Sequence, residues 1–261
     1  MKEPSVSSAA SSAASSTADA TPQVDRIVIT CEHGGARIPP AYQPLFDAHR
    51  DLLGTHRGYD FGALQLAREM SVALGAPLYA STTSRLLVDL NRSIGNPALH
   101  SEATRHLSLV ERRRIVDRYW RPHRQLVESQ VADAVGQGRR VVHIASHSFT
   151  PELHGEVRNA DIGLLYDPRR PGEGALARLW MKALKKAKSD LRVRLNYPYQ
   201  GKGDGLTSTL RSAHDPTLYV GIELEVNQAW AVRGGPPWRK LRGTLIDTLR
   251  SALAKFAESP V

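Results

Sequence analysis

Three apolar runs of the chain end in, or carry, side chains that can transfer protons or bind a metal ion. They supply Glu32 and His33 after 26–31, His147 after 140–146, and Glu223 and Glu225 within 217–227. Two histidines and a carboxylate with an open fourth position form a catalytic zinc site, and a free Glu nearby can serve as a general base. The residue types therefore predict metal-assisted hydrolysis, provided that the fold brings them together.

Two further segments carry polar side chains suited to the same chemistry. VDLNR supplies Asp89, Asn91 and Arg92, and THRGYDFGA supplies His56 and Asp60 just before an expected helix. An Asn-Arg pair can hold a substrate carboxylate through bidentate hydrogen bonds. Each segment is weak evidence alone, but together they indicate a metal-dependent hydrolase for an acyl amino acid.

Strands and helices alternate along the chain in a way that would gather these residues. We expect strands at 26–31, 76–81, 85–90, 140–146, 161–167, 191–196 and 217–227, and helices at 61–74, 108–135, 174–188 and 238–257. Ser108 and Glu111 form the pattern of a capping box. Continuous apolar strands alternating with helices predict an α/β fold with a mostly parallel sheet covered on both faces. In such sheets, ligands bind at the carboxyl ends of the strands.

Composition narrows the class of protein. The chain has 261 residues, of which 41% are hydrophobic, and a formal net charge of +9. No apolar run is long enough to span a membrane, so we expect a soluble protein without a membrane partner. The positive charge is spread along the chain, with one cluster in 105–124 and another in 182–194, where solvated outer faces of helices are expected. A small anionic substrate is therefore favoured over nucleic acid as the partner.

The amino-terminal segment differs from the rest. Residues 1–23 are rich in Ser and Ala with few large apolar side chains, which predicts a disordered tail before one folded domain at 24–261. The segment lacks the apolar block of a secretory signal. The single cysteine, Cys31, excludes an internal disulfide and is expected to be a buried apolar residue. These features predict a cytoplasmic location.

Six segments in order resemble the N-formylglutamate amidohydrolase family. They span most of residues 26 to 230 and read CEHGGARIP, THRGYDFGA, SRLLVDLNRS, HIASHSFTP, RNADIGLLYD and GIELEVNQ. The family is related to the zinc carboxypeptidases and to the aspartoacylase and succinylglutamate desuccinylase group. The resemblance implies a three-layer α/β/α fold of the phosphorylase/hydrolase type, one Zn²⁺ per chain and hydrolysis of N-formyl-L-glutamate to formate and glutamate.

The resemblance also implies roles for individual residues. His33 and His147 match the positions of the two histidine ligands, and Asn91 and Arg92 match the contacts to the substrate carboxylate. Glu225 matches the general base. The wider group has a Glu ligand where this sequence has Ala36, so the third ligand must come from elsewhere or the metal is bound differently. Candidates, in order of preference, are Asp60, Glu32 and His56.

Several residues admit a structural interpretation. Glu32 is as well suited to accept hydrogen bonds from the following turn as to bind metal, and His143 is expected to be a core residue with a satisfied ring. Ser148 lacks the strand-turn-helix context of a nucleophile. Arg85 is expected either to pair with Asp89 or to bind substrate. Lys202, in a glycine-rich loop, is a second candidate cation for a substrate side-chain carboxylate.

Other functions remain open at this point. The same fold would suit a zinc-dependent peptidase, an enzyme for a cell-wall amide or a deacylase for another N-acyl amino acid. A non-catalytic binding protein with a degenerate metal site would explain Ala36. Nucleic-acid binding through the basic helices would require affinity that falls steeply with salt. The sequence does not determine the oligomeric state.

Overall fold

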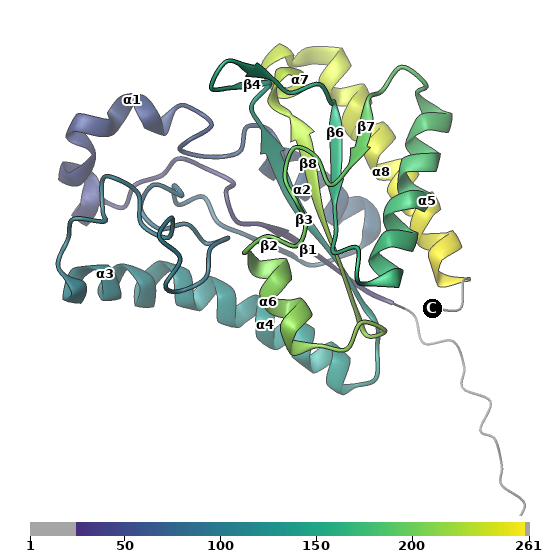
Figure 1. The fold of residues 1–261 in the computed structure, drawn as a ribbon, viewed down its shortest axis with the longest axis horizontal. Coiled ribbons are helices and arrows are strands. Elements are labelled where there is room, and N and C mark those ends of the chain that lie inside the picture. Colours follow the sequence, from purple (N-terminus) through teal and green to yellow (C-terminus); the bar gives the residue numbers. More distant parts are fainter. Residues whose placement is uncertain (1–24, 259–261) are drawn as a thin grey trace, which may run out of the picture.

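The computed structural model describes residues 25–258, so the Ser/Ala-rich segment 1–23 lies outside the described residues. The centre of the fold is a six-stranded sheet with the strand order β2-β1-β3-β8-β6-β7 (Figure 1). The strands are β1 (Arg26–Cys31), β2 (Leu78–Ala80), β3 (Val141–Phe149), β6 (Ile162–Leu165), β7 (Val193–Leu195) and β8 (Tyr219–Asn227). Only the pairing of β6 with β8 is antiparallel within this sheet. The predicted mostly parallel, mixed sheet is confirmed.

Helices cover both faces of the sheet and give the predicted α/β/α layers (Figure 1). Packed on one face are α2 (Ala63–Leu74), α5 (Pro171–Ala187) and α8 (Gly235–Ala257), and on the other α4 (Arg121–Gly136) and α6 (Leu206–Ala213). Alternate residues of β1 separate accordingly, because Ile29 packs in the first cluster and Val28 in the second. Buried Trp180 of α5 is among the largest side chains of the first cluster.

The predicted helix 108–135 is continuous but changes its winding. It consists of α3 (Leu109–Ile115), a π-helical turn (Val116–Trp120) and α4. Ser108 and Glu111 form the predicted capping box. The elements that the sequence did not indicate are the 3₁₀ helix η1 (Pro40–His49), α1 (Arg50–Leu53), the hairpin β4 (Glu152–Leu153) and β5 (Glu156–Val157), α6 and α7 (Gln228–Arg233).

The strand predicted at 85–90 is wrong. This segment forms turns that pack in a separate apolar cluster with η1 and the π-helical turn. Leu87, Val88 and Leu90 are almost fully buried there. A short apolar run does not distinguish a buried strand from a buried irregular segment. Asp89, Asn91 and Arg92 therefore follow a turn, which runs beside the sheet and is not part of it.

One face of the central strands changes from apolar to polar along its length. Beneath α4 and α6, Val141 in β3 is followed at two-residue intervals by His143, Ala145 and His147. The register pairs His147 with Glu225 of β8. His143 is the predicted satisfied core residue, since Tyr219 Oη lies 2.7 Å from its Nδ1. The polar groups thus gather at the carboxyl half of this face.

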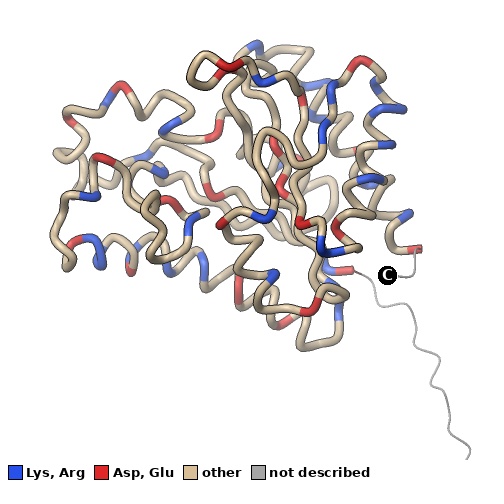
Figure 2. The backbone as a smooth tube through the Cα atoms, in the orientation of Figure 1, with Lys and Arg blue, Asp and Glu red and all other residues tan. Residues whose placement is uncertain are grey.

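Charged residues of both signs are distributed around the chain (Figure 2). The basic segment 105–124 includes acidic partners, as in the ion pair between Arg121 and Asp117 at 3.0 Å. Among the described residues, no helix is both long and apolar enough to cross a lipid bilayer.

Candidate active site

Three buried side chains place ligand atoms within 4.8 Å of one another. His33 follows β1, His147 lies in β3 and Asp60 precedes α2. Oδ2 of Asp60 lies 2.9 Å from Nδ1 of His147 and 3.4 Å from Nδ1 of His33. The two histidine positions and Asp60, the preferred carboxylate candidate, thus come together around one point.

The outward-facing nitrogens of both histidines contact other carboxylates. His33 Nε2 donates a hydrogen bond to Asp89 Oδ1 at 2.7 Å, and His147 Nε2 lies 3.1 Å from Glu32 Oε2. These contacts favour a proton on each Nε2 and leave each Nδ1 facing Asp60. Histidine ligands of metal ions commonly have such a carboxylate behind them. Glu32 therefore occupies an outer position behind His147, and His56, the third candidate, lies outside the cluster of three.

The backbone around these residues is closely packed. The Asp60 N–H donates to the His33 carbonyl at 2.9 Å, which ties the loop before α2 to the end of β1. A Cβ on Gly34 would lie 2.8 Å from the Ser81 carbonyl oxygen, so a side chain there would push the chain away from the end of β2. The glycines after His33 therefore permit a close backbone approach beside the cluster.

Electrostatics in the cluster favour positive charge at His147. Burial alone would lower the pKa of His147, but its contacts with Asp60 and Glu32 outweigh burial and hold the pKa well above its usual value. Burial would raise the pKa of Asp60, but His33 and His147 outweigh it and lower the pKa. The carboxylates are therefore ionised around a position that favours a cation.

Glu225 and Glu223 line the same cavity as the three-residue cluster, as expected for alternate residues of one strand. This cavity has a volume of about 500 Å³. Glu225 is buried and its Oε2 has no hydrogen-bond partner within the described part of the chain. Burial raises the pKa of Glu225 to about 8, with His147 opposing the change and Asp60 adding to it. A carboxyl group with this pKa can exchange protons near neutral pH.

The sequence matches the model of the N-formylglutamate amidohydrolase family over residues 25–231. This chain belongs to that family. Family membership supports a hydrolase that acts on amide bonds. The search of curated proteins yields no match.

Two solved structures are similar to this chain. A gene product from Agrobacterium tumefaciens is 29% identical, with a TM-score of 0.76, and the alignment covers 89% of this chain and 92% of that one. An N-formylglutamate amidohydrolase from Ralstonia eutropha JMP134 is 20% identical, with a TM-score of 0.67 and coverage of 88% and 93%. The latter similarity shows that the fold is shared.

The residues present in this amidohydrolase fit a zinc ion. Two imidazole nitrogens and one carboxylate oxygen are a common donor set for catalytic zinc. His33 Nδ1 is buried without a hydrogen-bond partner among the described residues, which is costly unless a ligand satisfies it. The Asp89 contact leaves this nitrogen free to be a donor to a metal ion.

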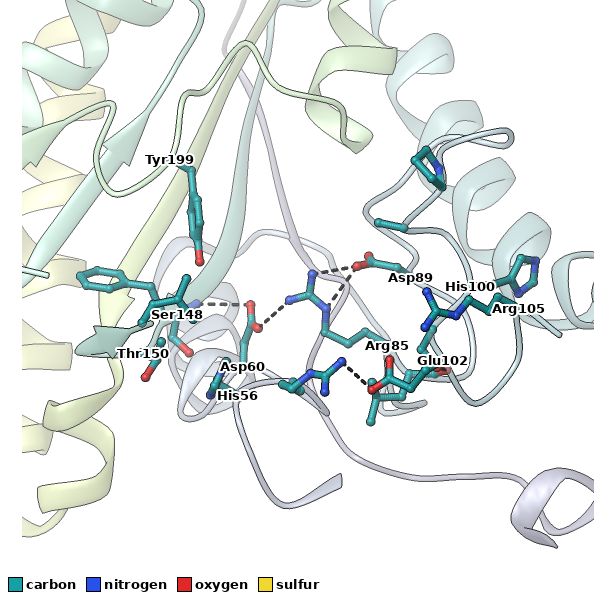
Figure 3. Close-up of a pocket in the computed structure, with 17 residues that line it drawn as sticks. His56, Asp60, Arg85, Asp89, His100, Glu102, Arg105, Ser148, Thr150 and Tyr199 are labelled. Carbon is teal, nitrogen blue, oxygen red and sulfur yellow. Dashed lines mark hydrogen bonds and ion pairs between the residues drawn. The ribbon is translucent and has the colours of Figure 1, made fainter. Parts of the chain in front are cut away.

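The predicted substrate-binding residues lie in one cavity, and the further candidate Lys202 lies elsewhere. Asn91, Arg92 and Arg85 all line the cavity with Glu225. Arg85 also forms ion pairs with Asp89 at 2.7 Å and Asp60 at 3.5 Å, so the expected pairing with Asp89 is confirmed and substrate binding by Arg85 stays a prediction (Figure 3). Lys202 lines a separate depression with Arg169 and Arg170, so its role as a second cation for the substrate stays a prediction.

Other residues of the site were not singled out from the sequence. His123 of α4 lies 3.7 Å from Oε1 of Glu32, and Tyr199 and Gln200 line the cavity from the loop before α6. Asp204 of that loop accepts hydrogen bonds from Ser93. Asp89 carried a sequence signal through its place in VDLNR and Asp204 through its place in the glycine-rich loop, whereas Tyr199, Gln200 and His123 carried none.

Proposed function

We propose that this family member hydrolyses the amide bond of an N-acyl amino acid, with N-formyl-L-glutamate as the first substrate to test. Formate and the free amino acid would be released. The observation that carries the proposal is one cavity that contains both the buried cluster His33, Asp60 and His147 and the buried carboxyl group of Glu225.

One zinc ion per chain would be held by the Nδ1 atoms of the two histidines and by Asp60. When bound, zinc would polarise the amide carbonyl and make water acidic enough to attack near neutral pH. Asp89 and Glu32 would hold the two imidazole rings in the orientation that presents Nδ1. The chain thus supplies both the donors and the groups that orient them.

Glu225 is the proton carrier in this proposal. It takes a proton from the attacking water, whose oxygen adds to the amide carbon. It then returns a proton to the nitrogen as the carbon-nitrogen bond breaks. Burial keeps the pKa of Glu225 high enough for its carboxylic acid form to donate that second proton.

Arg92 and Asn91 position the substrate. Nη1 of Arg92 donates to the backbone carbonyl of Asp204 at 2.7 Å, and its charge helps to lower the pKa of the Asp89 and Asp204 carboxyl groups. Asn91 Oδ1 accepts from the Leu206 N–H at 2.7 Å, which fixes the side chain, and its amide nitrogen lies 3.5 Å from Nε2 of His147 at the edge of the cavity. Both groups suit an α-carboxylate.

The test combines the metal content of the purified chain with hydrolysis of N-formyl-L-glutamate before and after chelation. We expect one zinc per chain, with activity lost on chelation and restored by zinc. Stoichiometric metal without hydrolysis of this compound would contradict the substrate assignment. Absence of both would contradict the enzyme assignment and favour a non-catalytic binding protein.

A further inference from the structure

A second cavity of about 560 Å³ adjoins the proposed active site. The two cavities share four lining residues, which are Asp60, Arg85, Ser148 and Tyr199. Figure 3 shows Asp60 and Arg85 at the centre of the second cavity, with Tyr199 and Ser148 on one side and His100 and Arg105 on the other. A molecule bound near the three-residue cluster can therefore extend past Asp60 into this second space.

N-formyl-L-glutamate does not account for two cavities of this size. Each lies within the range of volumes that bind a whole small molecule. The formyl carbon carries only a hydrogen beyond its carbonyl group, so it would leave the second cavity unused. The walls of that cavity are partly apolar, with contributions from Leu86, Pro97, Ala98, Phe149 and Leu153. Such walls suit a short hydrocarbon chain.

The charges around the second cavity leave one cation without a partner. Arg57 forms an ion pair with Glu102 at 2.6 Å, and Arg85 is paired with Asp60 and Asp89. Within residues 25–258, Arg105 has no carboxylate or hydrogen-bond partner for its guanidinium group. The cavity is therefore able to attract an anionic group.

The backbone that carries Arg105 is firmly attached to the protein. Its N–H donates to the Ser101 carbonyl at 2.8 Å, and the hydroxyls of Ser101 and Thr104 donate to the carbonyls of Leu86 and Leu87. Thr104 itself is fully buried. The exposed guanidinium thus projects from a fixed turn, which limits where an anion can meet it.

We propose that the second cavity binds the acyl part of the substrate and that Arg105 determines specificity for an acyl chain ending in a carboxylate. This rests on the proposed function, and it deepens the substrate class to N-acyl amino acids with an extended, anionic acyl group. The α-carboxylate then lies at Arg92, which lines only the first cavity, and the acyl terminus lies at Arg105, which lines only the second. Asp60, which would lie next to the scissile amide, lines both cavities.

The test compares kcat/KM for three L-glutamate derivatives that share alkyl-amide chemistry. N-pentanoyl-L-glutamate should exceed N-acetyl-L-glutamate by at least severalfold, because methylene groups become buried against the apolar wall. N-glutaryl-L-glutamate has the same number of acyl carbons as the pentanoyl compound but ends in a carboxylate. Its kcat/KM should be about threefold to fivefold higher, which corresponds to the free energy of an exposed ion pair. Equal values for all three compounds would overturn the proposal.

Two variants assign these preferences to the second cavity. Arg105→Gln should bring the glutaryl-to-pentanoyl ratio of kcat/KM to about one. Arg113→Gln, at an exposed position of α3 outside both cavities, should keep the wild-type ratio. Ala98→Phe should reduce turnover of the pentanoyl compound selectively by filling the apolar wall. A wild-type ratio in Arg105→Gln would overturn the role of Arg105.

The experiment also distinguishes the opposite orientation of the substrate, in which its amino-acid side chain lies in the second cavity. If Arg105→Gln instead equalises N-acetyl-L-glutamate and N-acetyl-L-norvaline, the second cavity holds the amino-acid side chain and the acyl assignment is wrong. If no compound is hydrolysed, the proposed function has failed, and calorimetry tests the cavity separately. Tighter binding of N-glutaryl- than of N-pentanoyl-L-glutamate, lost in Arg105→Gln, would support the anion subsite, whereas equal binding would overturn it.

Discussion

His147 contacts two carboxylates of the site, one through each of its ring nitrogens. Its two ring nitrogens lie 2.9 Å from Asp60 and 3.1 Å from Glu32, and all three side chains are almost fully buried. A buried carboxylate is costly unless it is paired, so Glu32 depends on its histidine neighbours. Burial would raise the pKa of Glu32, but His123 and His147 outweigh it and lower the pKa well below its usual value.

Replacing Glu32 by Gln tests whether it orients His147. The amide cannot stabilise positive charge on His147 as a carboxylate does, so zinc affinity should fall about 10-fold to 100-fold. Competition with a chromophoric chelator measures the affinity. Glu128→Gln, on the outer part of α4, is the matched control and should bind zinc as the wild type does. Unchanged affinity in Glu32→Gln would show that Glu32 only fills space.

Glu225→Gln separates proton transfer from metal binding. The amide cannot accept the proton from water, so kcat should fall about 10²-fold to 10⁴-fold. Zinc content should remain that of the wild type, because the three proposed ligands are untouched. Steady-state kinetics and metal analysis on the same preparation provide the two readings. Near-normal turnover would remove Glu225 from the base role.

The choice between Asp60 and Glu32 as metal ligand shows where sequence reasoning reaches its limit at this scale. Both are carboxylates next to apolar segments, and both become buried. What distinguishes them is which ring nitrogen of His147 each one faces, and that depends on packing between β1, β3 and the loop before α2. Residue types and spacing carry no information on ring orientation.

At the scale of elements, the strands were more predictable than the segments between them. Apolar β-branched runs marked β1, β3 and β8, because strands buried on both faces need them. Segment 85–90 is also a short apolar run, but it packs against η1 and the π-helical turn outside the sheet. Its conformation is held by contacts such as the Asp89 N–H to the Leu99 carbonyl at 2.9 Å, which sequence pattern cannot reveal.

The loop 196–205 lines one side of the active-site cavity, and Asp204 is one of the residues that anchor it. This side chain accepts hydrogen bonds from the Ser93 backbone at 3.0 Å and from Asn96 at 2.6 Å. The same loop carries Tyr199, which lines both cavities. Anchoring to the segment after Asn91 and Arg92 therefore connects the loop to the proposed substrate-binding residues.

Asp204→Ala should loosen this loop without unfolding the domain. We expect KM to rise severalfold while Tm changes little, because the lost hydrogen bonds are exposed and individually weak. Limited proteolysis should cleave the loop faster in the variant. Asp190→Ala, at an exposed aspartate outside both cavities, is the control. A large fall in Tm with unchanged KM would show that Asp204 acts on folding and not on the cavity.

At the scale of the whole molecule, one face of the sheet combines stability and chemistry. Val28, Val141 and Tyr219 pack beneath α4 and α6 near the start of their strands. Further along the same face, His147 and Glu225 stand side by side in register. Alternate side chains of the parallel strands thus form an apolar cluster at one end of this face and a titratable cluster at the other. The strand patterns in the sequence predicted this arrangement in outline.

The cluster lies between β1, β3 and the loop before α2, so a ligand bound there should stabilise the whole domain. Zinc at 100 times its dissociation constant would add about 2.7 kcal/mol, or roughly 5–10 °C in Tm for a chain of this size. Thermal unfolding with zinc and with a chelator measures the shift. His33→Asn should abolish most of it, since His33 contributes a proposed ligand, whereas His106→Asn, at an exposed histidine outside the cluster, should retain it. A full shift in His33→Asn would place the stabilising zinc elsewhere on the protein, because binding at the cluster requires the Nδ1 that this substitution removes.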